Sequence, residues 1–576
     1  MGSPPYCKLP DPPIALPPDS DPQTTETSPA SHLETLRDAY FALLAQGFST
    51  LCLHDEFIHF PRLASAWDYR FQAARLEESF LATAASRLRD LLSRLKHLPP
   101  VADSPETAGD LALLRQSLTG VLRELQPGGP WETDPFLYLK AGSLAFAPLL
   151  AQSSRMDRHD QEKLGELLSQ VARLFDWGRA QVRRLNRPGG LLRKGALADA
   201  RKFFHQALPA FLTKHCRREA WDRPLKEVHR SLERFAEGIY KLPTDAPLAR
   251  GALLLGEILT NWGFSGDLDR AAAILQEEIR ESRSALEHGA SLTEPGRSWP
   301  EVLESLTPDV GEVDILALYR GEVARLWGFW QQSGAFPLLK GRVVVAQTPV
   351  YLKSLRSSAS YAAPWGPPEE QPGYFYVTPE IEAAGHHLRH YRFLSAHETV
   401  PGHHLLDAAR LSLGAPVARQ YESPLFYEGW ACYAETLLMS EGYLTSQADY
   451  LVYWQRRLWR ALRGLADLEL QRGRWDLDQG LDCLRRAGYP EATARLQVLH
   501  LTLNPGYQLC YTLGLKEMLR LRDLFTARLG PVRFYEIVLG AGQLPFALVE
   551  QRLAVALAKQ ELGRHGRSQA GAWERE

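Results

Sequence analysis

Apolar residues recur at helical spacing through most of the chain from His32 to about Ala335. In the segment 268–286 they follow one another at spacings of three, four and seven, which places them on one helix face. The same pattern predicts helices over 73–98, 107–125 and 160–185, with breaks where Pro and Gly cluster. Because no segment repeats at a fixed period of 20–50 residues, a solenoid is disfavoured. We expect a large, mainly helical body with two lobes.

The pattern changes between residues 340 and 380. Residues 342–348 (RVVVAQT) and 373–377 (GYFYV) are rich in β-branched and aromatic side chains, which is typical of strands. The stretch between them, 357–371, is rich in Ser, Pro and Gly and reads as a connection. We therefore expect a small sheet, which either holds an extended peptide by strand addition or is a structural hairpin.

Helical patterns return after residue 420. Ser423 and Pro424 predict the N-cap and first residue of a helix that runs to about Gly442. A second helix is expected over 448–472, and a third is expected to start at Asn504 and Pro505.

Composition excludes several classes of protein. Of 576 residues, 45% are hydrophobic and 23% charged, which is ordinary for a globular chain. The 66 basic and 68 acidic residues leave a net charge of −2, so no basic field points to a nucleic-acid or anionic-membrane partner. The six cysteines have no C-x-x-C spacing, which argues against a disulfide scaffold or a cysteine zinc site. The pattern leaves the oligomeric state open.

The two ends of the chain differ from the rest in composition. Residues 1–30 are rich in Pro and contain no apolar run of the signal-peptide kind, which predicts a disordered arm and a cytoplasmic protein without membrane insertion. Residues 563–576 are polar, and we expect a flexible tail.

The residues that carry chemistry stand in the segment 397–404, which reads HETVPGHH. A carboxylate flanked by imidazoles provides the groups needed to bind Zn²⁺ and to take a proton from the zinc-bound water. The usual H-E-x-x-H spacing puts two His ligands at i and i+4, but here Pro401 stands at i+4 and the next histidines are His403 and His404. Either of these could be the second ligand beside His397.

Helix geometry turns this spacing into a prediction. On a straight helix, a residue six positions on lies about 9 Å along the axis and roughly 120° away, too far for one ion. Pro401 cannot donate a helical hydrogen bond, and Gly402 tolerates unusual dihedral angles. We therefore expect the helix to be interrupted at Pro401 and Gly402, so that a later His returns beside His397.

A zinc site of this kind needs a third protein ligand, and two His with one Glu is an established set of zinc ligands. Glu428 lies 25 residues after His403 in an apolar and aromatic run, FYEGWA. A buried unpaired carboxylate there is costly, and a metal would compensate it. The alternative is a core Glu hydrogen-bonded to Tyr or Arg.

Together these segments resemble the bacterial family of unknown function 885. The segments are GYFYV, HETVPGHH, YEGWACYAE (427–435) and PGYQLCYTLG (505–514), and the resemblance covers about residues 196–556. More distantly the arrangement is similar to helical gluzincin peptidases such as angiotensin-converting enzyme and thimet oligopeptidase. The resemblance implies a mainly α, two-lobed gluzincin-like fold, with a small sheet beside the active-site helix and a deep channel with zinc at its floor.

The resemblance also implies roles for individual residues. Position by position, His397, His403 and Glu428 become ligands of one Zn²⁺ per chain, with His404 as the alternative to His403. Glu398 becomes the general base. The remaining candidates are supporting or substrate-binding groups: Tyr511 for the oxyanion, Asp407 beside His403, and His404, Glu435, Arg463 and Tyr507.

Some of these candidates have a second interpretation. Tyr511 is either an oxyanion donor or an ordinary core tyrosine. Arg463 or Arg460 could bind a peptide C-terminus, or they could lie on a charged helix face with Arg463 paired to Asp467 at i+4. Asp407 is either a partner of the His403 imidazole or a solvated carboxylate.

The chain departs from the family pattern at three positions. Tyr507 stands where Gln is usual, and Gln471 and Tyr535 stand where the family commonly has His. These changes bear on substrate preference, and on activity, more than on zinc binding.

The expected protein is a zinc metallopeptidase for short peptides. Its expected parts are residues 31–300, a helical N-terminal part, and residues 301–562, the zinc-binding catalytic part, forming one continuous unit. The alternatives are a zinc hydrolase for a non-peptide amide or ester, and an inactive binding protein.

Overall fold

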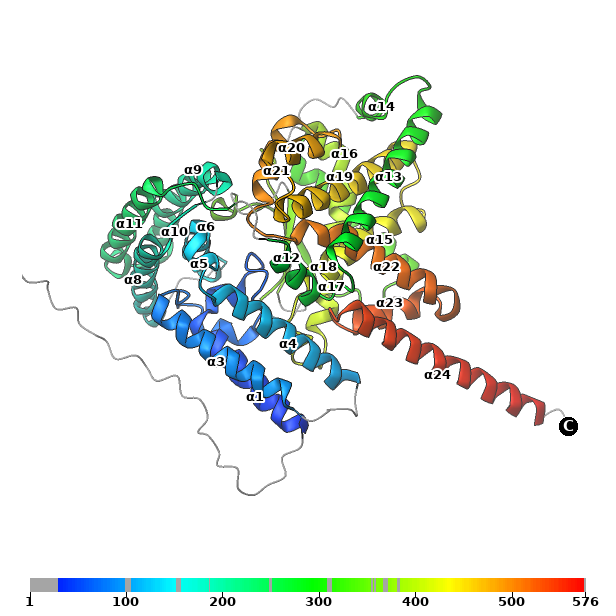
Figure 1. The fold of residues 1–576 in the computed structure, drawn as a ribbon, viewed down its shortest axis with the longest axis horizontal. Helices are drawn as coiled ribbons and strands as arrows, with labels where there is room; N and C mark the ends of the chain where they lie inside the picture. The colour runs from blue at the N-terminus through cyan, green and yellow to red at the C-terminus, as the bar shows by residue number, and fades with distance from the viewer. Residues whose placement is uncertain are drawn as a thin grey trace, which may run out of the picture.

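The fold of the chain is mainly helical, with one small sheet beside the helices of the C-terminal half (Figure 1). This confirms the predicted fold class. The computed structural model describes residues 29–98, 105–151, 157–185, 187–247, 251–307, 313–353, 356, 359–365, 371–380 and 384–573. The predicted Pro-rich arm lies outside these residues, apart from its last two positions, which begin α1.

Among the N-terminal helices, α1, α3 and α4 lie at the lower left of Figure 1, and α5 and α6 lie above them. The helices predicted over 73–98 and 107–125 are present as α3 and α4, which pack on each other. The elements are α1 (Pro29–Gly47), α2 (Ser49–Leu53), the 3-10 turn η1 (Ala64–Tyr69), α3 (Glu78–Lys96), α4 (Pro105–Leu125), α5 (Pro130–Thr133), α6 (Pro135–Leu144) and α7 (Ala147–Leu150).

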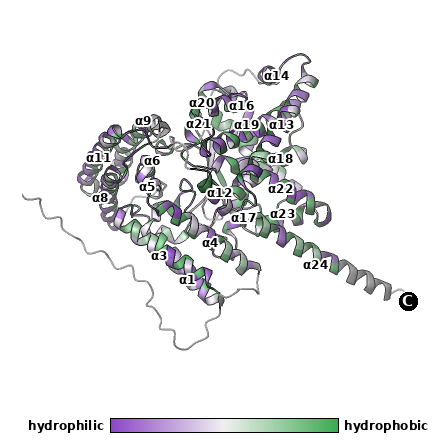
Figure 2. Cartoon of the chain, in the orientation of Figure 1, coloured by the Kyte–Doolittle hydropathy of each residue, from purple (hydrophilic) through white to green (hydrophobic). Residues whose placement is uncertain are grey.

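The next helices gather on one side of the molecule, opposite the group from α13 to α22 (Figure 1), as a two-lobed body requires. α8 and α11 form a long parallel pair through apolar faces that include Leu167, Leu174 and Leu232. Their outer faces are polar, so both colours mix along them in Figure 2. The elements are α8 (Arg158–Gln181), α9 (Arg187–Lys202), the π-helical turn η2 (Phe203–Ala207), α10 (Leu208–His215) and α11 (Arg218–Lys241).

The sheet contains a strand that the pattern did not predict. The order is β1-β3-β2, with β1 parallel and β2 antiparallel to β3. β1 and β3 confirm the predicted strands, but β2 lies in the stretch taken for a connection. At four residues, ASYA, it is too short to show an alternating pattern. The elements are α12 (Ala252–Asn261), α13 (Leu268–Thr293), α14 (Trp299–Ser305), α15 (Ile315–Ser333), β1 (Val343–Gln347), η3 (Val350–Leu352), β2 (Ala359–Ala362) and β3 (Gly373–Val377).

One face of this sheet packs on α15, through a cluster that includes Tyr319, Val345 and Phe375. β2 pairs with β3 along one edge, and its other edge faces α16, which begins the C-terminal group. The sheet therefore lies beside the helix that carries His397, as expected.

The C-terminal helices enclose the segment 397–404. They are α16 (Ala384–Glu398), α17 (His403–Leu411), α18 (Pro424–Ser440), α19 (Gln447–Gln471), α20 (Leu477–Arg485), α21 (Glu491–His500), α22 (Tyr507–Leu529), α23 (Pro531–Gly540) and α24 (Phe546–Trp573). α24 is helical into the segment predicted as a flexible tail, whose flexibility stays a prediction.

Two predicted helix starts differ in detail. Ser423 is at the N-cap of α18, but its hydroxyl donates to the Trp262 carbonyl at 3.1 Å instead of capping the helix. The N-cap of α22 is Gly506, two residues later than the predicted cap Asn504, and Gly506 adopts φ 85° there. Both differences come from contacts and backbone angles that periodicity does not encode.

α18 and α22 cross at backbone contact, which matters for the chemistry below. A Cβ added to Gly429 would lie 2.6 Å from the Gly514 backbone, and one added to Gly514 would lie 2.1 Å from the Leu425 carbonyl oxygen. Two glycines therefore allow the helix that carries Glu428 to meet the helix that carries Tyr507 and Tyr511. Among the described residues, no helix is long and apolar enough to cross a membrane.

Candidate metal centre

The helix interruption predicted from Pro401 and Gly402 is present. α16 ends at Glu398 and α17 starts at His403, and a short turn joins them. The amide of Gly402 donates to the Ala396 carbonyl at 2.9 Å, six residues back instead of four. This wider turn accommodates the two extra residues, so the His403 ring comes to 4.8 Å from the His397 ring, centroid to centroid.

Gly402 makes this turn possible. A Cβ at this position would lie 2.0 Å from the His397 carbonyl oxygen and 2.4 Å from the Ala396 carbonyl oxygen. The Trp430 indole donates to the Pro401 carbonyl at 2.8 Å and ties the turn to α18. The turn is thus held by the same helix that carries Glu428.

We expect Gly402→Ala to disrupt the centre, because backbone atoms cannot move aside as a flexible side chain could. Overpacking of this kind costs about 1–3 kcal/mol or more. The free energy of unfolding, measured in urea, should fall by at least that amount. Gly414→Ala is the matched control, since an added Cβ there meets nothing within 4 Å. Equal stability of the two variants would contradict this account of the turn.

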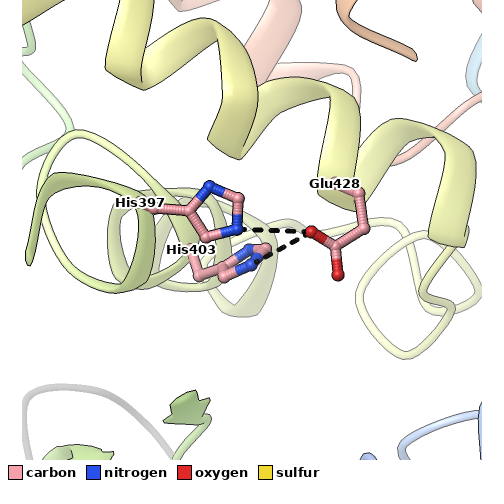
Figure 3. A group of neighbouring side chains, drawn as sticks. All are labelled: His397, His403 and Glu428. Carbon is pink, nitrogen blue, oxygen red and sulfur yellow. Dashed lines mark ion pairs between the residues drawn. The ribbon is translucent and has the colours of Figure 1, made fainter. Parts of the chain in front are cut away.

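Three side chains converge at the interruption. The Glu428 Oε2 atom lies 3.3 Å from His397 Nε2 and 3.7 Å from His403 Nε2. One ligand atom from each residue lies within 4.8 Å of the others, and all three residues are buried. Figure 3 shows both imidazoles directed at the same carboxylate oxygen. In the described part of the chain, these residues form the one group of three His, Cys, Asp or Glu with this geometry.

His404 is directed away from this group. Its Nδ1 lies 3.1 Å from the Tyr361 hydroxyl, and its Nε2 lies 3.0 Å from the Lys340 carbonyl oxygen. Both ring nitrogens are therefore occupied by the sheet and the segment before it. Of the two histidines that spacing left open, the geometry favours His403.

Glu435 orients His397. Its Oε1 lies 3.0 Å from His397 Nδ1, so Nδ1–H donates to the carboxylate and Nε2 faces the centre. Arg456 and Arg460 bind Glu435 in turn, at 2.7 Å and 2.5 Å. The two guanidinium groups outweigh the effect of burial and hold the pKa of Glu435 well below its usual range.

Tyr507, the departure from the usual Gln, orients Glu428. Its hydroxyl donates to Glu428 Oε1 at 2.5 Å, which leaves Oε2 for the two imidazoles. Oε2 is buried and has no hydrogen-bond partner of its own.

Asp407 does not orient His403, and the prediction that it might was wrong. Its carboxylate accepts hydrogen bonds from Arg410 at 2.9 Å and from the Tyr427 hydroxyl at 3.3 Å, and it is fully buried instead of solvated. The Tyr427 ring stacks on His403 at 3.9 Å. Asp407 reaches the imidazole only through this ring, which lies one residue before Glu428 and was not among the predicted site residues.

The pKa values of His403 and Glu428 suit a metal centre. Burial lowers the pKa of His403 to about 3, so its imidazole is neutral. Burial alone would raise the pKa of Glu428, but the imidazoles of His397 and His403 and the Tyr507 hydroxyl lower it to about 2. Neutral imidazole and ionised carboxylate are the forms that bind metal.

Glu398 directly follows His397, and its environment differs from that of Glu428. Burial raises its pKa to about 7, and a backbone hydrogen bond from Tyr361 in β2 opposes that rise. Tyr361 was not among the predicted site residues, because β2 carries no strand pattern. The free edge of the sheet thus adjoins the candidate base.

A cavity of about 780 Å³ opens on the other side of β2. Its walls come from both lobes and include Trp67, Tyr351, Arg356, Ala362 and Tyr376. Ala362 directly follows Tyr361, so the cavity reaches the residue next to the one that bonds Glu398.

Residues 61–553 match the family model described as "Bacterial protein of unknown function (DUF885)". The chain belongs to this family. This DUF885 match confirms the resemblance and extends it toward the N-terminus, from about residue 196 to residue 61. None of the curated proteins matches the chain.

Two solved structures share this DUF885 chain's fold. One is described as a "putative lipoprotein from Colwellia psychrerythraea", with 15% identity, a TM-score of 0.72, and coverage of 92% of this chain and 100% of that one. The other is described as a "putative lipoprotein of unknown function from Shewanella oneidensis", with 16% identity, a TM-score of 0.67, and coverage of 91% and 99%. At these identities the likeness shows the fold alone.

The two positions where DUF885 members commonly have His lie apart from the ligand group. Gln471 is fully buried and hydrogen-bonds Asp467. The Tyr535 ring packs on Phe336 at 4.8 Å and on Trp430 at 6.5 Å. Neither side chain contacts His397, His403 or Glu428 in the described structure.

Proposed function

We propose that this protein is a zinc-dependent peptidase that hydrolyses short peptides. The observation that carries the proposal is the convergence of His397, His403 and Glu428 beside Glu398. This His₂Glu set is one that zinc enzymes use, and the buried Glu428 Oε2, which faces both imidazoles without a hydrogen bond, fits a cation. One Zn²⁺ per chain would polarise the scissile carbonyl and lower the pKa of a water molecule toward about 7.

In this proposal Glu398 moves the proton. Its carboxylate takes a proton from the attacking water and passes it to the leaving amine nitrogen. Burial supports this role, because a carboxylate with a pKa near 7 binds and releases a proton at neutral pH. The Tyr361 amide holds the carboxylate in place.

Tyr511 is the proposed donor to the oxyanion. Its ring stacks beside His397, with centroids 6.3 Å apart. Its hydroxyl makes no hydrogen bond with the described part of the chain and is free to donate to a developing negative charge. The cavity behind β2 is the proposed path for the peptide, and the cytoplasm remains the expected location.

Metal content tests the proposal directly. Protein purified without chelator should contain about one zinc per chain, and its activity against a peptide library should vanish with a chelator and return with zinc. Zinc with cleavage of esters or non-peptide amides but not peptides would favour the alternative hydrolase. Absence of stoichiometric zinc would refute the enzyme and leave a binding protein.

The pair Tyr507→Phe and Tyr511→Phe separates metal binding from catalysis. Tyr507→Phe removes the hydrogen bond to Glu428, and losses of such supporting contacts weaken metal binding by roughly 10–100-fold. Tyr511→Phe should keep zinc affinity and lower kcat by roughly 100–1,000-fold, as for one oxyanion donor. Zinc titration and steady-state kinetics measure both. Identical behaviour of the two variants would contradict the assigned roles.

A further inference from the structure

α19 carries four arginines in the segment 456–463, and three of them have acidic partners. Arg456 and Arg460 bind Glu435, and Arg457 binds Glu278 at 2.5 Å. Arg463, one turn after Arg460, has neither a hydrogen bond nor an ion pair within the described residues.

The partner expected for Arg463 is engaged elsewhere. Asp467 accepts hydrogen bonds at Oδ2 from the amides of Gly506 at 2.9 Å and Gln508 at 3.3 Å, where it holds the start of α22. The predicted pair at i+4 is therefore absent, and that prediction was wrong. Arg460, the other candidate for a peptide carboxylate, is bound by both oxygens of Glu435.

Arg463 is instead held between aromatic rings. Its guanidinium carbon lies 4.8 Å from the Tyr511 ring centre and 5.5 Å from that of Trp459. Its Nε atom is buried without a partner, while the side chain as a whole is half-buried. The rings fix the orientation of the guanidinium and leave its hydrogen-bond donors unsatisfied.

The position of Arg463 relates it to the metal centre. The Tyr511 ring that it contacts also stacks beside His397. Arg463 is thus one side chain away from a candidate ligand, on the side of the centre formed by α19 and α22. Tyr511 and Tyr507 are half-buried there as well, so this side is accessible.

The guanidinium of Arg463 has no acidic partner among the described residues. Partial burial of a charged group without a partner is unfavourable, and the rigid fork of Arg matches the two oxygens of a carboxylate. A peptide offers that group at its C-terminus or in an acidic side chain.

We propose that Arg463 binds a carboxylate of the substrate and makes this a site for peptides that carry a negative charge close to the scissile bond. This inference rests on the proposed peptidase function and specifies its substrate class. A free C-terminus would make the protein a carboxypeptidase or peptidyl-dipeptidase, and an Asp or Glu side chain would make it selective for acidic peptides.

Three matched peptides of one sequence distinguish these sources: one with a free C-terminus, one amidated, and one amidated with a Glu near the cleaved bond. They are tested on the zinc-loaded wild type and on Arg463→Gln, Arg463→Lys and Arg486→Gln. Arg486 is exposed at the end of α20 and controls for loss of a positive charge.

We expect kcat/KM of the wild type to be higher for a carboxylate-bearing peptide than for the neutral amide by roughly 10–150-fold, the range for a charged hydrogen bond. Arg463→Gln should abolish that preference with zinc content unchanged, Arg463→Lys should restore part of it, and Arg486→Gln should keep it. A wild type without preference, or an Arg463→Gln variant that retains it, overturns the inference.

A binding measurement tests the carboxylate site separately from catalysis. Calorimetry on Glu398→Gln measures the affinity for the same peptides without cleavage. Stronger binding of the charged peptide, lost in Glu398→Gln/Arg463→Gln, supports the carboxylate site even if no peptide is hydrolysed. Equal binding of charged and neutral peptides refutes the site even if hydrolysis is found.

Discussion

Glu398→Gln should lose peptide hydrolysis by roughly 100–10,000-fold in kcat while the protein keeps its zinc and its fold. The substitution preserves shape, and the amide oxygen of Gln can still accept the hydrogen bond from the Tyr361 backbone. It removes the one property that the mechanism needs, a carboxylate that takes up a proton. Burial of the neutral amide is also less costly than burial of a carboxylate.

The measurement is kcat for a cleaved peptide together with zinc content and thermal midpoint. Loss of kcat with unchanged zinc identifies Glu398 as a group that acts on the reaction. Retained kcat would refute the role of base, and loss of zinc would show that Glu398 is part of the metal site instead. Gly414→Ala again serves as a neutral change.

His403→Ala and His404→Ala should differ sharply in metal content. His403 Nε2 faces the carboxylate oxygen shared with His397, so its removal leaves two of three ligands. We expect zinc to fall well below one per chain and activity to disappear. His404 bonds Tyr361 and Lys340, so its removal should cost about 1–3 kcal/mol of stability and leave zinc bound.

These two neighbours form a matched pair, because both are buried histidines in the first turn of α17. Elemental analysis of each variant, with urea unfolding in parallel, separates ligand loss from destabilisation. Zinc retained in His403→Ala and lost in His404→Ala would reverse the assignment. Zinc retained in both would place the metal at another site.

Much of the centre was predictable because it is local. Pro401 and Gly402 cannot both continue a helix, so the interruption followed from backbone chemistry. Glu428 was found because a carboxylate in an aromatic run needs a partner. Periodicity likewise predicted α3, α4, α8 and α13 to within five residues at every end except the C-terminus of α13, which lies seven residues beyond the predicted end.

The failures involve contacts between distant parts of the chain. Arg463 and Asp467 have the spacing of an ion pair, yet Asp467 binds the amides at the start of α22 about 40 residues later. Asp407 has the spacing to support His403, yet it binds Arg410 and Tyr427. Asp467 is bound by donors from another helix, whereas Asp407 is bound by Arg410 on its own helix and by Tyr427 from α18.

The sequence by itself determined the helical class, the family, the interruption and the set of groups able to hold a metal, because periodicity, backbone restrictions and residue chemistry are encoded in short segments. The tertiary structure decided between His403 and His404, brought Glu435 and Tyr507 to their ligands, placed β2 beside Glu398 and left Arg463 without a partner. These outcomes depend on where α18, α19 and α22 cross, and the Gly429–Gly514 contact that sets one crossing joins residues 85 positions apart. Spacing along one helix cannot determine which side chain a second helix presents.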